Sequence, residues 1–444
     1  MKEGPQSHNS LPERETFATR FGLLMTMIGA AVGLGAVWRF PYMAGRFGGA
    51  AFVLFYLAVM VFIGIPALMA EWTLGRHTGR GTLGAFQRGG FPGGKIVGGF
   101  LFVVVFFATG YYSNAVGWVV FHALGEAAKS VGIRLDAGAI LPPAAGYNAL
   151  SMVLQLSMTA LVIIACGLVL VKGLRKGIER ASKIIVPALF GILIVLILRS
   201  LTLQGAGQGV KWYIGSFRFH DLTPGNMAAA LGMAFFSLSL GGTFMVIYGS
   251  YLDRKAFIPR NAVFTGISAS LAGILAGFAI FPAVFAFGLE PASGPGLIFT
   301  TLPRTFDQMP VGWLFGFLFF VGLFGAAFLS DVAAFEVLVG GLIDNTRLER
   351  KKAVILACAV VFVLSVPPMI NYRIFIPWDL TFGSGMQALG SLLAVVTAVW
   401  CIRRTAVLEE LSVGGRRSFP RWLFWWLRLA VPVAILIVGI NWLF

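Results

Sequence analysis

Long apolar runs alternate with short polar segments along the whole chain. A run of about 20 apolar residues is long enough for a helix to cross a bilayer. The pattern predicts an all-α polytopic membrane protein with about eleven transmembrane helices. The runs lie near residues 21–45, 48–72, 97–125, 150–171, 178–201, 227–252, 262–288, 312–343, 353–371, 378–402 and 420–443.

Composition supports the same class of protein. Hydrophobic residues make up 58% of the 444 residues and charged residues only 12%, whereas about a quarter of a soluble chain is charged. The net charge of +16 would suit nucleic acid, but the basic residues lie in short loops between apolar runs. Contact with anionic membrane lipid explains this charge, so we expect no nucleic-acid partner. The histidines are scattered, and no nucleophile–base pair or metal-ligand spacing indicates an enzyme.

The distribution of basic residues predicts the orientation. Segments such as DRKAFIPR and DNTRLERKK follow even-numbered runs, while the opposite loops carry little basic charge. The positive-inside rule places the N-terminus in the cytoplasm and the C-terminus outside. We expect a multi-pass protein in the plasma membrane of a prokaryote. The predicted parts are a cytoplasmic tail (1–20), five helices (21–201), five further helices with an extracellular loop near 290–310 (202–402), and a cytoplasmic loop with the last helix (403–444).

Two of the apolar runs are interrupted by glycine-rich segments. The first is GAAVGLG, Gly29 to Gly35, and the second is SLSLGGT, Ser237 to Thr243. They open two successive blocks of five runs, and breaks at matching positions of two halves indicate the central site of a transporter. The glycines at 29 and 33 would also suit a helix-packing face. Because both blocks are broken, we favour a binding site and an inverted repeat.

Five motifs carry a resemblance to a known family. They are GAAVGLGAVWRFPY, EWTLGR, KGIER, FFSLSLGG and GAAFLSD, in this order. With them, the chain resembles the neurotransmitter:sodium symporters. The resemblance implies a five-plus-five inverted repeat with unwound centres in the first and sixth helices. It also implies import of an amino acid or related amine by alternating access, driven by sodium, with no obligate protein partner.

The resemblance implies a substrate pocket between the two breaks. The hydroxyl of Tyr112 would donate to a carboxylate, and Phe236 would cover the substrate; without the resemblance, both side chains could simply be packed. Small residues at 108, 242 and 334 would enlarge the pocket. The implied substrate-binding residues are Ala31, Gly33, Leu34, Gly35, Ala108, Tyr112, Phe236, Ser237, Ser239, Gly242, Ser330, Asp331 and Ala334.

The resemblance also implies ion sites, and this chain departs from them. Of two sodium sites, the second would use Gly29, Val32, Ala326 and Ser330. Its other hydroxyl position is Leu329, which cannot coordinate an ion. At the first site, Ala36 and Ser268 replace two asparagines, and Ala272 replaces a neighbouring acid. We therefore expect one sodium ion and no chloride.

Charged pairs are implied at both ends of the pathway. Arg39 would pair with Asp379 as the outer gate, and Arg14 with Asp344 as the inner gate, near Tyr251. Each could be an ordinary interfacial charge. One pair on each face fits alternating access better than a channel, which needs only one gate.

Asp331 is an acid at a position where the family usually has a small hydroxyl residue. An acid within the membrane is a functional candidate by default. It could pair with a cationic substrate, complete an ion site beside Ser330, carry a proton, or form a structural pair. The alternative function is therefore a proton-coupled or sodium-independent transporter of a cationic amino acid or amine.

Overall fold

The computed structural model describes residues 15–217, 219–221, 223–290, 297–415 and 418–443, and these residues form helices and connecting segments without a strand. The first half contains α1 (Arg20–Ala31), η1 (Gly35–Arg39), α2 (Phe40–Arg46), α3 (Ala50–Val59), η2 (Met60–Gly64), α4 (Ile65–Thr78), α5 (Thr82–Arg88), α6 (Gly94–Lys129), α7 (Ala149–Val171), η3 (Leu174–Glu179) and α8 (Arg180–Leu201).

The second half contains α9 (Ala206–Val210), η4 (Lys211–Gly215), η5 (Phe219–Asp221), α10 (Pro224–Ser237), α11 (Phe244–Gly249), α12 (Ile258–Ala286), η6 (Leu297–Thr301), α13 (Leu302–Asp307), α14 (Gly312–Asn345), α15 (Arg350–Met369), α16 (Tyr372–Trp378), η7 (Asp379–Gly385), α17 (Met386–Val396), η8 (Thr397–Cys401), α18 (Arg404–Ser412) and α19 (Arg421–Leu443).

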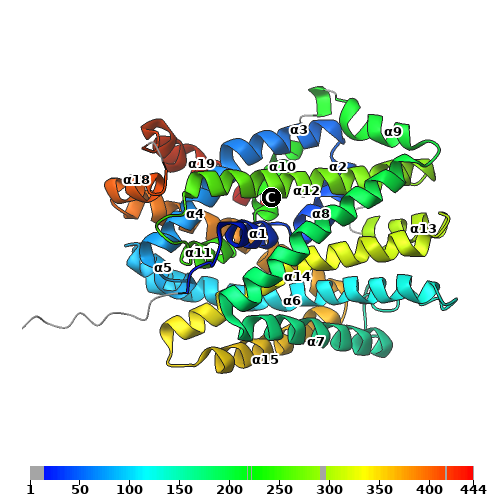
Figure 1. Cartoon of the computed structure of the whole chain (residues 1–444), viewed down its shortest axis with the longest axis horizontal. Coiled ribbons are helices and arrows are strands. Elements are labelled where there is room, and N and C mark those ends of the chain that lie inside the picture. Colours follow the sequence, from blue (N-terminus) through cyan, green and yellow to red (C-terminus); the bar gives the residue numbers. More distant parts are fainter. Residues whose placement is uncertain (1–14, 218, 222, 291–296, 416–417, 444) are drawn as a thin grey trace, which may run out of the picture.

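The predicted apolar runs correspond to helices of membrane-spanning length. Among the described residues, 8 helices are long and apolar enough to cross a membrane, or 9 when α1 and α2 are counted as one bent span. The broken pair of α10 and α11, together with α19, occupies the remaining runs. Figure 1 shows α1 near the middle of the bundle, where it packs against α8, α12 and α14.

The first break follows α1, and the chain bends there by 52°. Close packing explains why glycines occupy it. A Cβ on Gly33 would collide with the hydroxyl of Ser330, and a Cβ on Gly35 would lie 2.6 Å from the ring of Phe236. The backbone of this segment therefore lies directly against α14 and α10.

The second break separates α10 from α11 and has an unusual backbone. Ser239 and Thr243 have φ angles of 51° and 59°, a left-handed conformation that costs free energy for residues other than glycine. The backbone N–H of Gly241 donates to Oε1 of the fully buried Glu71 at 2.9 Å. In a membrane, a backbone amide freed from a helix needs such a partner. Glu71, from the motif EWTLGR, thus stabilises the break.

Candidate functional site

A cavity lies where the two breaks face each other. It has about 480 Å³ of empty space, including its mouth. Nonpolar groups, hydroxyls and one amide side chain surround it. Its lining residues are Ala31, Gly33, Gly35, Ala108, Thr109, Tyr111, Tyr112, Phe236, Ser239, Phe244, Ser330, Ala334 and Gln387. Most of the predicted substrate residues are therefore brought together, whereas Leu34, Ser237, Gly242 and Asp331 do not line the cavity.

Tyr112 connects α6 to the first break. Its hydroxyl oxygen accepts a hydrogen bond from the backbone N–H of Leu34 at 3.1 Å. The amide of Leu34, one of the implied substrate-binding residues, is thus already bonded within the protein. A tyrosine hydroxyl that accepts one hydrogen bond keeps its own proton as a donor. Tyr112 can therefore donate to an anion in the cavity while it bonds the unwound segment.

Oxygen atoms cluster at the end of α1. The hydroxyls of Ser239 and Ser330 both donate to the carbonyl of Ala30, at 2.8 and 3.1 Å, and Ser330 lies 3.5 Å from the carbonyl oxygen of Gly29. Leu329 packs on the other side, where a Cβ on Gly29 would lie 2.7 Å from its Cδ1. Of the predicted sodium ligands, Ser330 and Gly29 are therefore adjacent, and Leu329 adds no oxygen.

The other two predicted sodium ligands are buried at the same junction. Val32 caps the C-terminal end of α1, where its N–H donates to the carbonyl of Ile28 at 2.7 Å. Ala326 lies on α14, one helical turn before Ser330, and only 1% of it is exposed. Since α14 packs against α1, both residues lie on elements that meet near the oxygen cluster.

Asp331 points away from the cavity, so the prediction that it faces the substrate is wrong. It is fully buried, and its carboxylate accepts from the hydroxyl of Ser113 on α6, at 3.1 and 2.9 Å. The thiol of Cys166 on α7 lies 3.8 Å away. Residues four apart share a helix face, so Ser330 and Ala334 line the cavity and Asp331 is turned toward α6 and α7.

The pocket is less enlarged than the small residues suggested. A Cβ on Gly242 would lie 2.6 Å from the ring of Phe244. The ring of Phe244 therefore fills the space that Gly242 leaves, and Phe244 itself lines the cavity. Ser237 is fully buried and is not among the residues that line the cavity. Ala108 and Ala334 remain as the small residues on the cavity wall.

At the outer gate, Arg39 makes other contacts than expected. Its guanidinium lies 4.4 Å from the ring centroid of Phe236, and its Nη1 donates to the hydroxyl of Ser384 at 3.1 Å. Arg39 and Asp379 are both described, and no ion pair within 4.0 Å joins them. Ser384 and Asp379 belong to the same segment, η7. Arg39 thus contacts η7, the segment that contains Asp379, through the hydroxyl of Ser384.

At the inner gate, Arg14 lies outside the described residues. Asp344 accepts from the backbone N–H of Gly81 at 3.1 Å through its side chain. Its backbone carbonyl accepts from Arg80 at 2.7 Å. These contacts join the end of α14 to the start of α5, so Asp344 connects two elements in this structure.

Tyr251 belongs to a buried cluster that the sequence reasoning missed. Its hydroxyl donates to Glu336 Oε1 at 2.6 Å, and Arg350 pairs with the same fully buried carboxylate at 2.5 Å. The Nε of Arg350 also donates to the carbonyl of Leu170 at 2.7 Å. The cluster therefore joins α7, α14 and α15 to the turn that follows α11. An acid inside the apolar stretch AAFEVLVGG was the signal for it.

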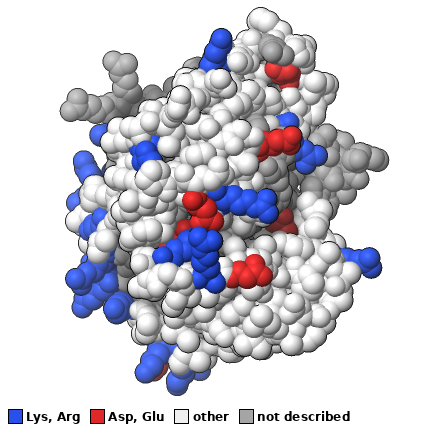
Figure 2. All heavy atoms as spheres, turned by 90° about the vertical axis from the view of Figure 1, so that its right-hand side faces the viewer, with Lys and Arg blue, Asp and Glu red and all other residues white. Residues whose placement is uncertain are grey.

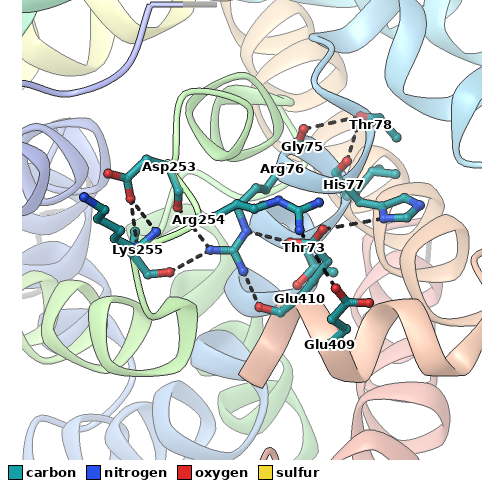
Figure 3. A network of polar contacts seen from close by, with 12 residues as sticks. Thr73, Gly75, Arg76, His77, Thr78, Asp253, Arg254, Lys255, Glu409 and Glu410 are labelled. Carbon is teal, nitrogen blue, oxygen red and sulfur yellow. Dashed lines mark hydrogen bonds and ion pairs between the residues drawn. The ribbon is translucent and has the colours of Figure 1, made fainter. Parts of the chain in front are cut away.

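Arg76, the last residue of EWTLGR, holds together the end of the molecule that carries the basic loops. Figure 3 shows it at the centre of a polar network. Its Nε bonds Glu410 of α18 at 2.7 Å, and its Nη1 bonds the carbonyl of Ala256 at 2.6 Å. Burial would raise the pKa of Glu410, but its hydrogen bonds and charge interactions with His77 and Arg76 outweigh burial and lower that pKa.

The face opposite the basic loops, which includes α9 and α13, carries both acidic and basic side chains. Figure 2 shows acidic and basic side chains close to one another near the middle of this face. Among the described ion pairs, Lys129 of α6 bridges Glu126 at 2.8 Å and Asp307 of α13 at 2.7 Å. Mixed charges of this kind contrast with the basic loops at the other end.

Comparison with known proteins decides the family. The profile of the family described as "Sodium:neurotransmitter symporter family" matches residues 14–130 and 146–442. This chain belongs to that family. The symporter is similar to a sodium-dependent transporter of Bacillus subtilis, with 35% identity over 96% of this chain and 97% of the relative. A sodium-dependent transporter of Haemophilus influenzae is 32% identical over 97% of this chain and 99% of the relative.

The symporter's fold also matches a solved structure. The crystal structure of MhsT in complex with L-phenylalanine has a TM-score of 0.84 and 33% identity, covering 97% of this chain and 100% of that one. The predicted family and the all-α fold are therefore confirmed, and the Bacillus subtilis and Haemophilus influenzae relatives are both described as sodium-dependent transporters. The family is one of transporters, not enzymes, and its members are multi-pass membrane proteins.

Proposed function

We propose that this symporter imports a neutral amino acid whose side chain is apolar and as large as an aromatic ring. One observation carries the proposal: no Asp, Glu, Lys or Arg is among the residues that line the cavity. A charged substrate side chain buried there would lack a partner and cost several kcal/mol. The bound L-phenylalanine of MhsT, a neighbour at 33% identity, supports the same substrate class.

The α-amino and carboxylate groups of such a substrate need partners in the cavity. The N-terminal end of η1, which begins at Gly35, carries partial positive charge, and the C-terminal end of α10 at Ser237 carries partial negative charge. The carboxylate would lie against Gly33, Gly35 and the hydroxyl of Tyr112. The amine would lie against the carbonyls at the end of α10, with Phe236 above it and the side chain toward Ala108 and Ala334.

A single sodium ion would drive this import. Sodium is a hard cation that prefers oxygen ligands, as calcium does. The carbonyl of Gly29 and the hydroxyl of Ser330 are already adjacent, and the carbonyls of Val32 and Ala326 would complete the site. Leu329 leaves this site one oxygen short, and Ala36 removes a side-chain ligand from the other predicted site. Chloride has no role in this scheme.

Import would proceed by alternating access in the plasma membrane. Sodium and substrate shift a conformational equilibrium only if they bind one state better than the others. In this scheme ion and substrate would bind at the two breaks, between the segments 21–201 and 202–402, which would act as the two repeats. Arg39, with Asp379, would close one side of the cavity. Asp344 and Tyr251 would close the other, at the cytoplasmic face, where the N-terminus would also lie.

Uptake into proteoliposomes tests the proposal. Radiolabelled L-phenylalanine should accumulate under an inward sodium gradient and fail to accumulate when potassium replaces sodium on both sides. Unlabelled L-leucine should compete, and L-lysine, L-glutamate and tyramine should not. Ala334→Trp, which fills the cavity, is the inactive control. Effective competition by L-lysine would refute the neutral substrate, and sodium-free uptake that follows a proton gradient would refute sodium coupling.

A further inference from the structure

Two arginines and two tryptophans form a cluster where η8, α18 and α19 meet. The guanidinium of Arg428 lies 4.6 Å from the ring centroid of Trp400 and 5.6 Å from that of Trp425. The guanidinium of Arg404 lies 5.4 Å from the same Trp425 ring. We call Arg404, Arg428, Trp400 and Trp425 the arginine–tryptophan cluster. Both cations therefore stack on aromatic faces.

Stacking leaves the donors of both guanidiniums free. A guanidinium has five N–H donors in its plane, and a ring beneath it uses only its face. Among the described residues, neither Arg404 nor Arg428 bonds an oxygen or lies within 4.0 Å of a carboxylate. The acids of nearby α18 are engaged elsewhere, since Glu409 pairs with Arg254 at 3.9 Å and Glu410 with Arg76 at 2.7 Å.

The cluster faces outward near one end of the membrane-spanning bundle. Trp400 is 50% exposed and Trp425 45% exposed. Figure 1 shows α19 and α18 at the edge of the bundle, beside the end that carries the basic loops. Arg428 is seven residues into α19, so it lies about 10 Å along the axis from the helix start. This depth suits the boundary between lipid headgroups and hydrocarbon, where tryptophans are enriched.

Hydrogen bonds hold the cluster in place before any ligand binds. Trp400 Nε1 donates to the carbonyl of Arg428 at 2.9 Å, which connects η8 to α19. Two residues earlier in α19, Trp426 Nε1 donates to the carbonyl of Phe62 at 2.6 Å and attaches α19 to η2. These bonds attach α19 to η8 and η2, so Arg404 and Arg428 both lie within 5.6 Å of the centroid of the Trp425 ring before any ligand binds.

We propose that the arginine–tryptophan cluster binds the phosphate of an anionic phospholipid. Arginine recognises phosphate with paired N–H donors, and stacking on tryptophan orients the guanidinium plane. Two cations without an acidic partner favour a headgroup of net negative charge over a zwitterionic one. The acyl chains of the lipid would lie along the apolar, exposed face of α19. This site is separate from the substrate cavity and does not depend on the proposed substrate.

Native mass spectrometry of the full-length purified protein tests this site. After delipidation, the protein is given equal amounts of dioleoyl phosphatidylglycerol and dioleoyl phosphatidylcholine. The wild type should retain phosphatidylglycerol over phosphatidylcholine by about fivefold or more, and Arg404→Gln/Arg428→Gln should lose this preference. The control Arg347→Gln/Lys351→Gln removes two positive charges near the start of α15, away from α19, and should keep the preference.

A second measurement separates lipid binding from loss of fold. Added phosphatidylglycerol should raise the melting temperature of the wild type and of the control, and leave that of the cluster variant unchanged. If the double variant does not fold, Arg404→Gln, an exposed substitution, replaces it and should lose about half of the added stability. Equal loss of preference in cluster and control variants would overturn the site in favour of diffuse charge. An oligomer that dissociates in the cluster variant without a change in lipid binding would overturn it in favour of a second copy.

Discussion

The hydroxyl of Tyr112 accepts the backbone N–H of Leu34 at 3.1 Å, so one side chain of α6 bonds the unwound segment of the first span. The same hydroxyl lines the cavity and has a proton to donate. Two roles thus meet in one oxygen atom, and a single substitution removes both.

Tyr112→Phe should weaken binding of L-phenylalanine by about tenfold or more, because a hydrogen bond to a charged group contributes about 1.5–3 kcal/mol. Equilibrium binding of radiolabelled L-phenylalanine to purified protein in sodium measures the effect. Tyr372→Phe is the control, since Tyr372 packs against Trp118 and Phe375 and does not line the cavity. Equal losses in the two variants would argue against a contact between Tyr112 and the carboxylate.

Leu329→Ser should strengthen sodium binding. Leu329 packs against Gly29, beside the hydroxyl of Ser330, and a serine there would supply the oxygen that the predicted sodium site lacks. We expect the sodium concentration for half-maximal binding of L-phenylalanine to fall several-fold, together with some loss of thermal stability from the removed packing.

Ser330→Ala should shift the same sodium titration in the opposite direction. Ser157→Ala is the matched control, because the hydroxyl of Ser157 bonds only within its own helix. If both Leu329→Ser and Ser330→Ala leave the sodium titration unchanged, the ion binds elsewhere.

Asp331→Asn should leave substrate preference unchanged, because Asp331 contacts Ser113 and Cys166 and not the cavity. The ratio of apparent affinities for L-phenylalanine and L-lysine, measured by competition, should stay within about threefold of the wild type. Asp331→Ala should instead cost about 1–3 kcal/mol of stability, since it leaves Ser113 without its buried partner. A tenfold change in the affinity ratio for Asp331→Asn would contradict the orientation of this side chain.

The location of the cavity could be predicted from the sequence, because its cause is local. Glycines and left-handed residues interrupt two apolar runs at matching positions, and backbone groups freed there must meet near the middle of the bundle.

The face that Asp331 presents could not be predicted in this way. α14 is buried around nearly its whole circumference in this region, so polarity does not distinguish its faces, and one residue of rotation moves a side chain from cavity to core.

Other contacts of the site could not be predicted from the sequence, because they depend on residues that follow a break, a turn or a change of helix type. The ring of Phe244 reaches back over Gly242, which the loss of a side chain at 242 alone could not reveal. Gln387 of α17 lines the cavity, and it follows the π-helical segment η7. A π-helix has more residues per turn than an α-helix, so it changes which later residues share a face. Glu336 was visible as an acid in an apolar run, but its partner Arg350 follows a turn and belongs to the next helix.

Arg350→Gln should destabilise the protein by about 3 kcal/mol or less, because it leaves the buried carboxylate of Glu336 without its cation while Tyr251 still donates to it. Glu336→Gln/Arg350→Gln should recover part of this loss, since no buried charge then remains. Thermal unfolding in detergent is measured for the wild type, Arg350→Gln, Glu336→Gln and the double variant, which together form a double-mutant cycle. Additive effects would show that the two side chains do not interact.

The link between Arg76 and Glu410 should make stability depend on pH in the acidic range. The pKa of Glu410 is lowered in the folded state, so its contribution is fully present above the unfolded value, about 4.3, and is lost as pH falls through the folded value. At pH 7, Glu410→Gln should melt at a lower temperature than the wild type, and the difference should persist down to about pH 5 and shrink only as the pH falls below about 4. Glu409→Gln, at an exposed neighbouring position, should show little difference at either pH. If the gap between wild type and Glu410→Gln widened on acidification, the network of Figure 3 would not stabilise this end of the molecule through the Glu410 carboxylate.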